Sequence, residues 1–164
     1  MKRIFVFVFV LALSLAASGV LLAQDIPLQD NPFVGTWKLN VAKSKFTGVP
    51  APKSETRRVV AEIGGETVGY KGIAADGGPI AYSFTTNLDG KDSPISGTQP
   101  LGSDTVAAKR VDANTIESTS KKAGKTIFTT RSVVSKDGKV LTQTTKGTNG
   151  EGQPISITTV WDKQ

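Results

Sequence analysis

The residue types that most often carry catalytic chemistry are scarce in this sequence. It contains no His and no Cys. A Ser-His-Asp triad and a thiol nucleophile are therefore impossible, and zinc or copper would lack their usual ligands. Ser44 lies between Lys43 and Lys45, a pattern typical of a polar loop rather than of Ser-Lys catalysis. We expect no metal, no cofactor and no enzyme activity.

Carboxylates gather only where the chain is expected to turn. Asp76 lies in an Asp-Gly-Gly segment, and Asp89 and Asp92 flank Gly90-Lys91. Paired carboxylates can exchange protons with a substrate or hold calcium. An Asp in a tight turn more often accepts a hydrogen bond from its own backbone. We favour the turn interpretation and keep a calcium site as the alternative.

Three arginines could meet an anionic ligand. Arg57 and Arg58 are adjacent in a predicted strand, so one of them must point inward. Arg131 shares the parity of Ile127 and Val133 rather than that of Phe128 and Val134, so the sequence does not decide whether its side chain points into the barrel or outward. An inward arginine would anchor an anion, whereas an outward or structurally paired one would not.

Aromatic side chains could line a cavity or simply fill the core. Small residues (Thr, Ser, Ala and Gly) occupy many predicted interior positions, which leaves room for a ligand. A barrel of about eight strands or more can hold one small molecule. The candidate ligand-binding residues are Trp37, Tyr70, Tyr82, Phe84, Phe128 and Arg131.

Period-2 alternation and regular turn signals predict the fold. Bulky residues alternate with small polar ones over 33–39, 80–85 and 155–161, and Asp-Gly or Gly-Gly pairs separate the strands. A short helical turn near 41–45 is the only helix expected. The sequence predicts an all-β, single antiparallel up-and-down β-barrel of about 8–10 strands, with the last strand beside the first. The predicted core is Phe33, Trp37, Leu39, Val59, Ile63, Val68, Tyr70, Ile80, Tyr82, Phe84, Ile116, Phe128, Val140, Ile155, Ile157 and Trp161.

The N-terminus predicts export. A positive pair, Lys2-Arg3, precedes an apolar run over 4–22, and Ala23 precedes polar residues. This order is typical of a secretory signal peptide. The alternative is a retained anchor, since the run is near the ~20 residues that span a bilayer. We predict a signal peptide over 1–23, a polar lead-in over 24–32 and one domain over 33–164, in the periplasm or outside the cell.

The charge pattern indicates a solvated surface. The net charge is +6, and acidic residues lie between most of the basic ones. Nucleic-acid binding would require a basic stripe. We expect no nucleic-acid partner and no integral membrane segment after cleavage.

Residues 31–39, NPFVGTWKL, resemble the opening strand of the calycins, a superfamily that includes the lipocalins and fatty-acid-binding proteins. The resemblance implies that Trp37 plugs one end of a barrel and that a late arginine, here Arg131, braces it. The chain from 31 to 164 is also similar to a family of small exported bacterial proteins with a lipocalin-like barrel and unestablished activity. The segments that carry this are GTWKLN (35–40), AKS (42–44), KRVDANT (109–115), SKDGK (135–139), KGTN (146–149) and GQP (152–154).

One part of the superfamily pattern is missing. Fatty-acid-binding proteins place two helices after the first strand, and residues 40–54 are too few and too rich in proline for such a lid. Their late Arg and Tyr, which grip a carboxylate, also have no counterpart. A fatty-acid headgroup site is therefore not carried over.

Three functions remain open. We favour an exported protein that binds a small, largely apolar ligand in a barrel cavity. The alternative is a structural or interaction protein of the cell envelope with a filled barrel, whose protein partners the sequence does not indicate. An isomerase or hydrolase that uses Arg131 and Asp89 at the barrel mouth is the third.

Overall fold

The computed structural model describes residues 31–149 and 151–164, so the predicted signal peptide (1–23) lies outside the described residues. In this part the chain forms one antiparallel sheet of 12 strands and two short 3-10 helices, Val41–Lys43 and Pro100–Gly102. The strands are β1 (Gly35–Leu39), β2 (Lys45–Thr47), β3 (Ser54–Glu62), β4 (Gly65–Ile73), β5 (Pro79–Thr86), β6 (Asp89–Pro94), β7 (Ser96–Gly97), β8 (Thr105–Asp112), β9 (Thr115–Lys122), β10 (Lys125–Val134), β11 (Val140–Thr148) and β12 (Pro154–Lys163).

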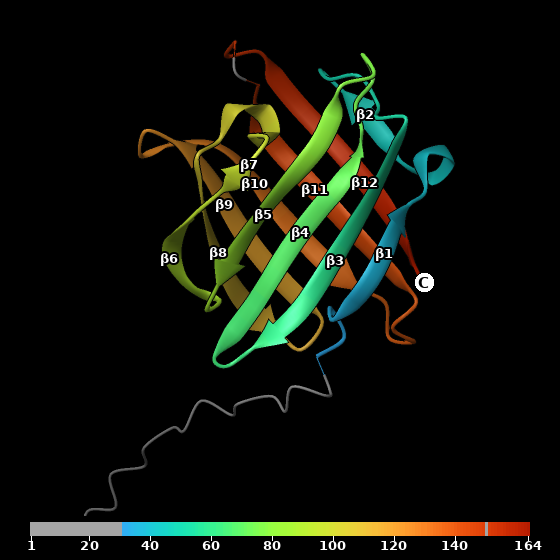
Figure 1. Cartoon of the computed structure of the whole chain (residues 1–164), viewed down its shortest axis with the longest axis vertical. Coiled ribbons are helices and arrows are strands. Elements are labelled where there is room, and N and C mark those ends of the chain that lie inside the picture. Colours follow the sequence, from blue (N-terminus) through green and yellow to red (C-terminus); the bar gives the residue numbers. More distant parts are fainter. Residues whose placement is uncertain (1–30, 150) are drawn as a thin grey trace, which may run out of the picture.

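The sheet curls into a barrel in which the first strand lies beside the last (Figure 1). Its order is β6-β8-β9-β10-β11-β12-β1-β3-β4-β5-β7, and β2 adds to β12. Leu39 of β1 lies opposite Trp161 of β12, and Gly35 lies opposite Val59 of β3. The predicted all-β up-and-down barrel and the pairing of its first strand with its last are confirmed. The three short strands β2, β6 and β7 account for the higher strand count.

The barrel is nearly, but not fully, closed by hydrogen bonds. In the described residues β5 pairs with β7 and β6 pairs with β8, so no ladder joins β5 to β6. The backbone N–H of Arg110 donates to the carbonyl of Leu88 at 3.3 Å, and Ile95 N–H donates to Asp104 at 2.9 Å. Both bonds join the β6 segment to the β8 side of the sheet and so extend the β6–β8 pairing beside the gap.

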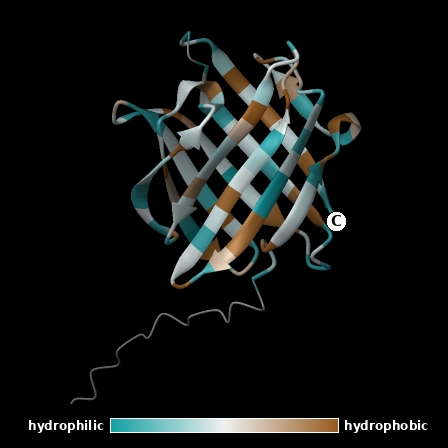
Figure 2. Ribbon diagram, in the orientation of Figure 1, coloured by the Kyte–Doolittle hydropathy of each residue, from teal (hydrophilic) through white to brown (hydrophobic). Residues whose placement is uncertain are grey.

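Alternation along each strand separates the inner face from the outer one. Apolar and polar bands follow one another along the strands in Figure 2. Arg57 of β3 is 4% exposed while its neighbour Arg58 is exposed. The prediction that one of this pair points inward is confirmed, because successive side chains of a strand leave on opposite faces.

Trp37 plugs one end of the barrel, as predicted. It is 0% exposed, and its indole N–H donates to the carbonyl of Phe33 at 2.8 Å. The cation over its ring is Lys163 Nζ, 5.0 Å from the ring centroid, and this Nζ also donates to the carbonyl of Pro32 at 3.3 Å. The expectation that Arg131 braces Trp37 is wrong: Arg131 lies on the outer face and pairs with Glu117.

A buried ion pair completes this closed end. Glu66 is 1% exposed, and its carboxylate lies 3.7 Å from the guanidinium of Arg110 and accepts from Asn31 at 3.3 Å. Arg110 also lies 5.4 Å over the ring of Phe33. Burial lowers the pKa of Arg110, and the charge of Glu66 opposes this. Because its partners are in place, the buried carboxylate is compensated.

Two members of the predicted core are wrong. Ile63 is 99% exposed, because it forms the tip of the turn between β3 and β4. Val140 is half-buried and pairs with Asp162, whereas Leu141 lies opposite Trp161 and is 0% exposed. A shift of one residue exchanges the two faces of a strand.

The turn predictions are mostly confirmed. The chain reverses at Gly64-Gly65 and Asp137-Gly138, but Asp89-Gly90 lies inside β6 and the reversal falls at Asn87-Leu88. Leu88 adopts a φ of 57° there. The side chain of Asp89 accepts from the backbone of Lys91 at 3.0 Å, as the turn interpretation required. Asp92 pairs instead with Lys121 at 2.6 Å.

Candidate functional site

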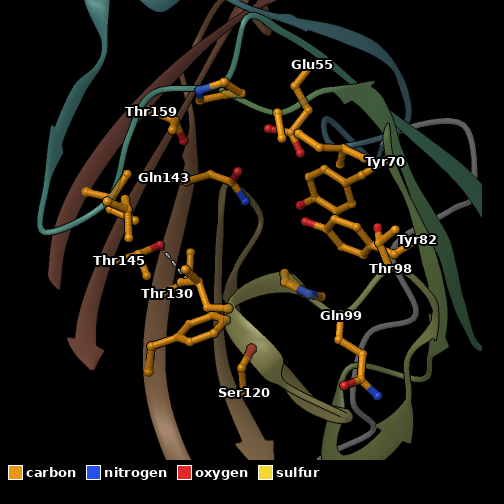
Figure 3. Close-up of a pocket in the computed structure, with 18 of the residues that line it drawn as sticks. Glu55, Tyr70, Tyr82, Thr98, Gln99, Ser120, Thr130, Gln143, Thr145 and Thr159 are labelled. Carbon is orange, nitrogen blue, oxygen red and sulfur yellow. Dashed lines mark hydrogen bonds between the residues drawn. The ribbon is translucent and has the colours of Figure 1, made fainter. Parts of the chain in front are cut away.

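A cavity of about 550 Å³ lies inside the barrel (Figure 3), and Trp37 is not among the residues that line it. Inward residues of β4 and β5 form one wall, and those of β9 to β12 form the other. The side chains alternate along these strands, so every second residue reaches the interior. The cavity exists because many of those interior positions hold Thr, Ser or Gln instead of large apolar residues.

The first wall is aromatic. The rings of Tyr70 and Tyr82 stack with centroids 4.5 Å apart and planes 13° apart. Trp161 meets Tyr70 edge-on, at 6.0 Å and 70°. Ile80 and Phe84 continue this wall along β5. Such a surface binds flat or aliphatic groups and attracts cations to its ring faces.

The second wall is rich in hydroxyls. Thr130 and Thr145 share a hydrogen bond of 2.8 Å, and Thr159 accepts from the indole of Trp161 at 2.9 Å. The amide of Gln143 donates to Ser132 at 3.0 Å. Ser118 and Ser120 add further hydroxyls. This wall offers a ligand both donors and acceptors, so the cavity is amphipathic.

Glu55 of β3 is one of two charged residues that line the cavity. Its side chain is half-buried and extends toward the tyrosine pair in Figure 3. Loss of hydration on burial raises the pKa of this carboxyl to about 7. The other charged residue that lines the cavity is Asp76, exposed in the β4–β5 hairpin. Within the described part of the chain, no Lys or Arg lines the cavity.

Arg57 points into the barrel beside Tyr70 but is not among the residues that line the cavity. Its Nε donates to the hydroxyl of Tyr70 at 3.0 Å, and its guanidinium lies 5.8 Å from the centre of that ring. Its Nη1 is buried without a hydrogen bond among the described residues. The pKa of Tyr82 is raised, chiefly by burial. Electrostatic interactions with Tyr70 and Glu55 add to this rise, and the interaction with Arg57 opposes it.

Three loop segments frame the cavity opening. They are residues 49–52, the hairpin 74–79 and residues 95–101. Leu101, in the last of these, points into the cavity region with a φ of 52°, a conformation that is unfavourable for a leucine. The opening is therefore built from loops, which vary in position more readily than the strands.

Four of the six predicted ligand-binding residues line the cavity: Tyr70, Tyr82, Phe84 and Phe128. Trp37 does not, because it is packed in the closed end. Arg131 is a correction: it faces solvent, and its guanidinium pairs with Glu117 at 2.5 Å. It follows the parity of Val133, which is also exposed. Asp89, proposed with Arg131 for acid–base work, is likewise outside the cavity.

Sequence reasoning missed Glu55 and the hydroxyl wall. Glu55 shares its parity with Arg57 and Val59, so an inward position for Arg57 would have predicted an inward Glu55. The hydroxyl wall was noticed only as small residues at interior positions. Its members are Ser118, Ser120, Thr130, Gln143, Thr145 and Thr159.

Two further properties bear on the function. In residues 31–149 and 151–164, no helix is long and apolar enough to cross a membrane. The same residues contain no group of three His, Cys, Asp or Glu side chains that could hold a metal ion.

The chain is similar to solved structures but matches no family model and no curated protein. Among solved structures, the chain is similar to zebrafish ileal bile acid-binding protein, crystallised with cholic acid. The identity is 12% and the TM-score 0.48, over 81% of this chain and 99% of that chain. The architecture described above is that of an antiparallel up-and-down β-barrel with an interior cavity.

Proposed function

We propose that this protein binds a small, largely apolar molecule inside its barrel. The observation that supports this is the cavity of about 550 Å³ with an aromatic wall facing a hydroxyl wall. Ligand sites in proteins are typically concave, mostly apolar and fitted with a few polar groups, and their volumes are commonly ~300–1,000 Å³. The ligand would place its apolar body against Tyr70, Tyr82 and Phe84 and its polar groups against Thr130 and Gln143.

The alternative of a filled barrel that acts through its outer surface lacks this support. A filled barrel needs large side chains at the interior positions of β9 to β12, and these positions hold small hydroxyl residues instead. The enzyme alternative also loses its candidates, because Arg131 and Asp89 do not meet in the cavity. Binding without turnover is the function that the geometry supports best.

Titration with Nile red, an uncharged dye sensitive to its surroundings, tests the proposal. We expect saturable one-to-one binding to the folded protein, since the dye fits an apolar cavity. Near-ultraviolet circular dichroism should confirm the fold first, because molten states also bind such dyes. Trp161 lines the cavity, so its fluorescence should change with occupancy, and Trp161→Phe should remove that change.

A matched pair of variants locates the binding. Thr130 of β10 faces the cavity, whereas its neighbour Thr129 is exposed on the outer face. Thr130→Phe should fill the space and weaken Nile red binding by about tenfold or more, a loss near 1.4 kcal/mol. Thr129→Phe should leave binding unchanged. Equal binding by both variants would place the dye on the outer surface and contradict the proposal.

We propose further that the protein is exported and acts in the periplasm or outside the cell. The support is the order of charge, apolar run and small residue over 1–23. N-terminal sequencing of the mature protein from cell fractions should find Gln24 as the first residue, in an extracytoplasmic fraction. A chain that begins at Met1 in the membrane fraction would support the retained anchor instead.

A further inference from the structure

The charges that reach the cavity indicate what kind of polar group a ligand carries. Glu55 and Asp76 are the charged residues in its lining, and the described residues contribute no cation to it. An anionic ligand would meet two carboxylates and no counterion there. A neutral or cationic ligand avoids this repulsion.

Glu55 has no ion-pair partner among the described residues and could act as the counterion of a bound cation. Within the described part of the chain its carboxylate forms no ion pair and accepts no side-chain hydrogen bond, and burial alone accounts for its altered titration. A desolvated carboxylate is unfavourable unless an opposite charge or a donor compensates it. The missing partner can be supplied by a ligand, since the side chain borders an open cavity.

The aromatic wall beside Glu55 suits the same kind of ligand. Tyr70 and Tyr82 stack at 4.5 Å, and Trp161 meets Tyr70 at 6.0 Å. Ring faces attract ammonium groups, and the attraction is stronger away from water. A carboxylate next to stacked aromatic rings is a combination that recognises an organic cation.

Resting on the proposed function, we propose that the ligand is an amphiphile with a protonated amine, which pairs with Glu55 beside Tyr70 and Tyr82 while its apolar chain fills the barrel. Thr130 and Thr145 share one hydrogen bond, which leaves one hydroxyl proton of the pair for a polar group of the ligand, while the apolar chain would lie along Ile80 and Phe84. Further polar groups of the ligand would bind Gln143 or Ser118.

Other charged groups face this position and shape its pH dependence. Arg57, on the same face of β3, is buried beside Tyr70 and repels a cation that moves deeper into the barrel. Tyr70 and Tyr82 face Glu55 from β4 and β5, and burial raises the pKa of Tyr82, which stays neutral. Asp76 lies on the rim and Lys53 approaches Gly77 in the same hairpin. The amine is therefore held near the opening, beside Glu55.

The test compares decylamine, decanol and decanoic acid by isothermal titration calorimetry, after Nile red binding has been measured. At a pH of about 8 we expect decylamine to bind most tightly and decanoic acid most weakly. Glu55→Gln should weaken decylamine binding about tenfold or more and leave decanol binding unchanged. Glu62→Gln removes the same charge from an exposed site on the same strand and should change neither.

The pH profile separates a counterion from a merely structural residue. Below the carboxyl's pKa of about 7, amine binding must displace a proton, so affinity should fall about tenfold per pH unit. Glu55→Gln should abolish that slope, because an alkylamine stays protonated over this range.

Three outcomes would overturn the inference. The first is decanoic acid binding more tightly than decylamine, which would assign the charge recognition to Arg57. The second is an equal loss of all three ligands in Glu55→Gln, which would make Glu55 structural. The third is Nile red binding without decylamine binding, which leaves the proposed function standing. Failure of Nile red and all three ligands would instead refute both proposals.

Discussion

At the scale of single residues, Glu55 lies in an environment that disfavours its charge. It loses hydration among aromatic neighbours, and its carboxyl gains a proton at a pH where an ordinary glutamate has none. The outward neighbours on β3 could carry the same charge at no such cost, since Thr56 and Arg58 face solvent. A carboxylate kept at a costly position beside a cavity is a candidate for ligand recognition.

Glu55 should make the stability of the protein depend on pH. Its pKa rises from 4.5 to about 7 on folding, so the native state holds this proton more tightly than the unfolded chain. Its contribution to stability is complete below pH 4.5 and is lost as the pH rises through about 7. Relative to the wild type, the free energy of unfolding of Glu55→Gln should therefore increase as the pH rises through this window, by at most about 3 kcal/mol. The increase should be smaller than this limit because solvent reaches the side chain.

Urea unfolding at several pH values measures this difference. Glu62→Gln is the control, since Glu62 is exposed at the far end of β3. It should follow the wild type at every pH. A Glu55→Gln curve parallel to the wild type from pH 4.5 upward would show that the carboxyl is not desolvated.

At the scale of elements, close approach of strands depends on a few glycines. Gly147 of β11 lies opposite Phe128 of β10, a cavity residue. A Cβ on Gly147 would lie 2.2 Å from the carbonyl oxygen of Ile127 and 2.6 Å from the Cβ of Phe128. The glycine therefore leaves the space that lets Phe128 lie where it lines the cavity.

Gly147→Ala should destabilise the protein by about 2 kcal/mol or more, because backbone atoms and Phe128 must both move. Gly69 of β4 is a matched control, because a Cβ added there would lie 4.0 Å from its nearest neighbour, the Cβ of Ser83. Gly69→Ala should change stability by about 0.5 kcal/mol at most. Thermal unfolding of the two variants measures the difference, and equal midpoints would contradict the close approach at Gly147.

At the scale of the whole molecule, the barrel combines a solid end with a hollow one. Trp37, Phe33 and the Glu66–Arg110 pair fill the closed end, and the cavity occupies the other. The sheet closes through β1 and β12, which lie more than a hundred residues apart in the chain. The closed end can therefore hold the barrel together whether or not the cavity is occupied.

Occupancy of the cavity should stabilise the whole barrel. A ligand that binds only the folded state at a concentration about a hundred times its Kd adds about 2.7 kcal/mol. Decylamine at that concentration should raise the melting temperature of the wild type and of Thr129→Phe, and raise that of Thr130→Phe by about half as much or less. A rise of equal size in both variants would show that the added stability does not come from the cavity.

The sequence by itself determined the fold class, because alternation over 33–39, 80–85 and 155–161 and the turns between strands are local signals. It also placed Trp37 on an inward face and identified four of the cavity residues, since parity fixes the face of each strand wherever the alternation is clear. Where the pattern was weak, parity failed. Val140 was chosen over Leu141, and Arg131 was left without a face.

Only the tertiary structure decided what the cavity holds. Glu55 became a candidate when three strands brought it beside Tyr70, Tyr82 and an empty interior, and neither desolvation nor the lack of a partner is a property of sequence. The cation that lies over Trp37 is Lys163 and not the expected Arg131, because the last strand returns beside the first. Burial, charge pairing and free volume depend on contacts between distant segments, so they appear only once the barrel has closed.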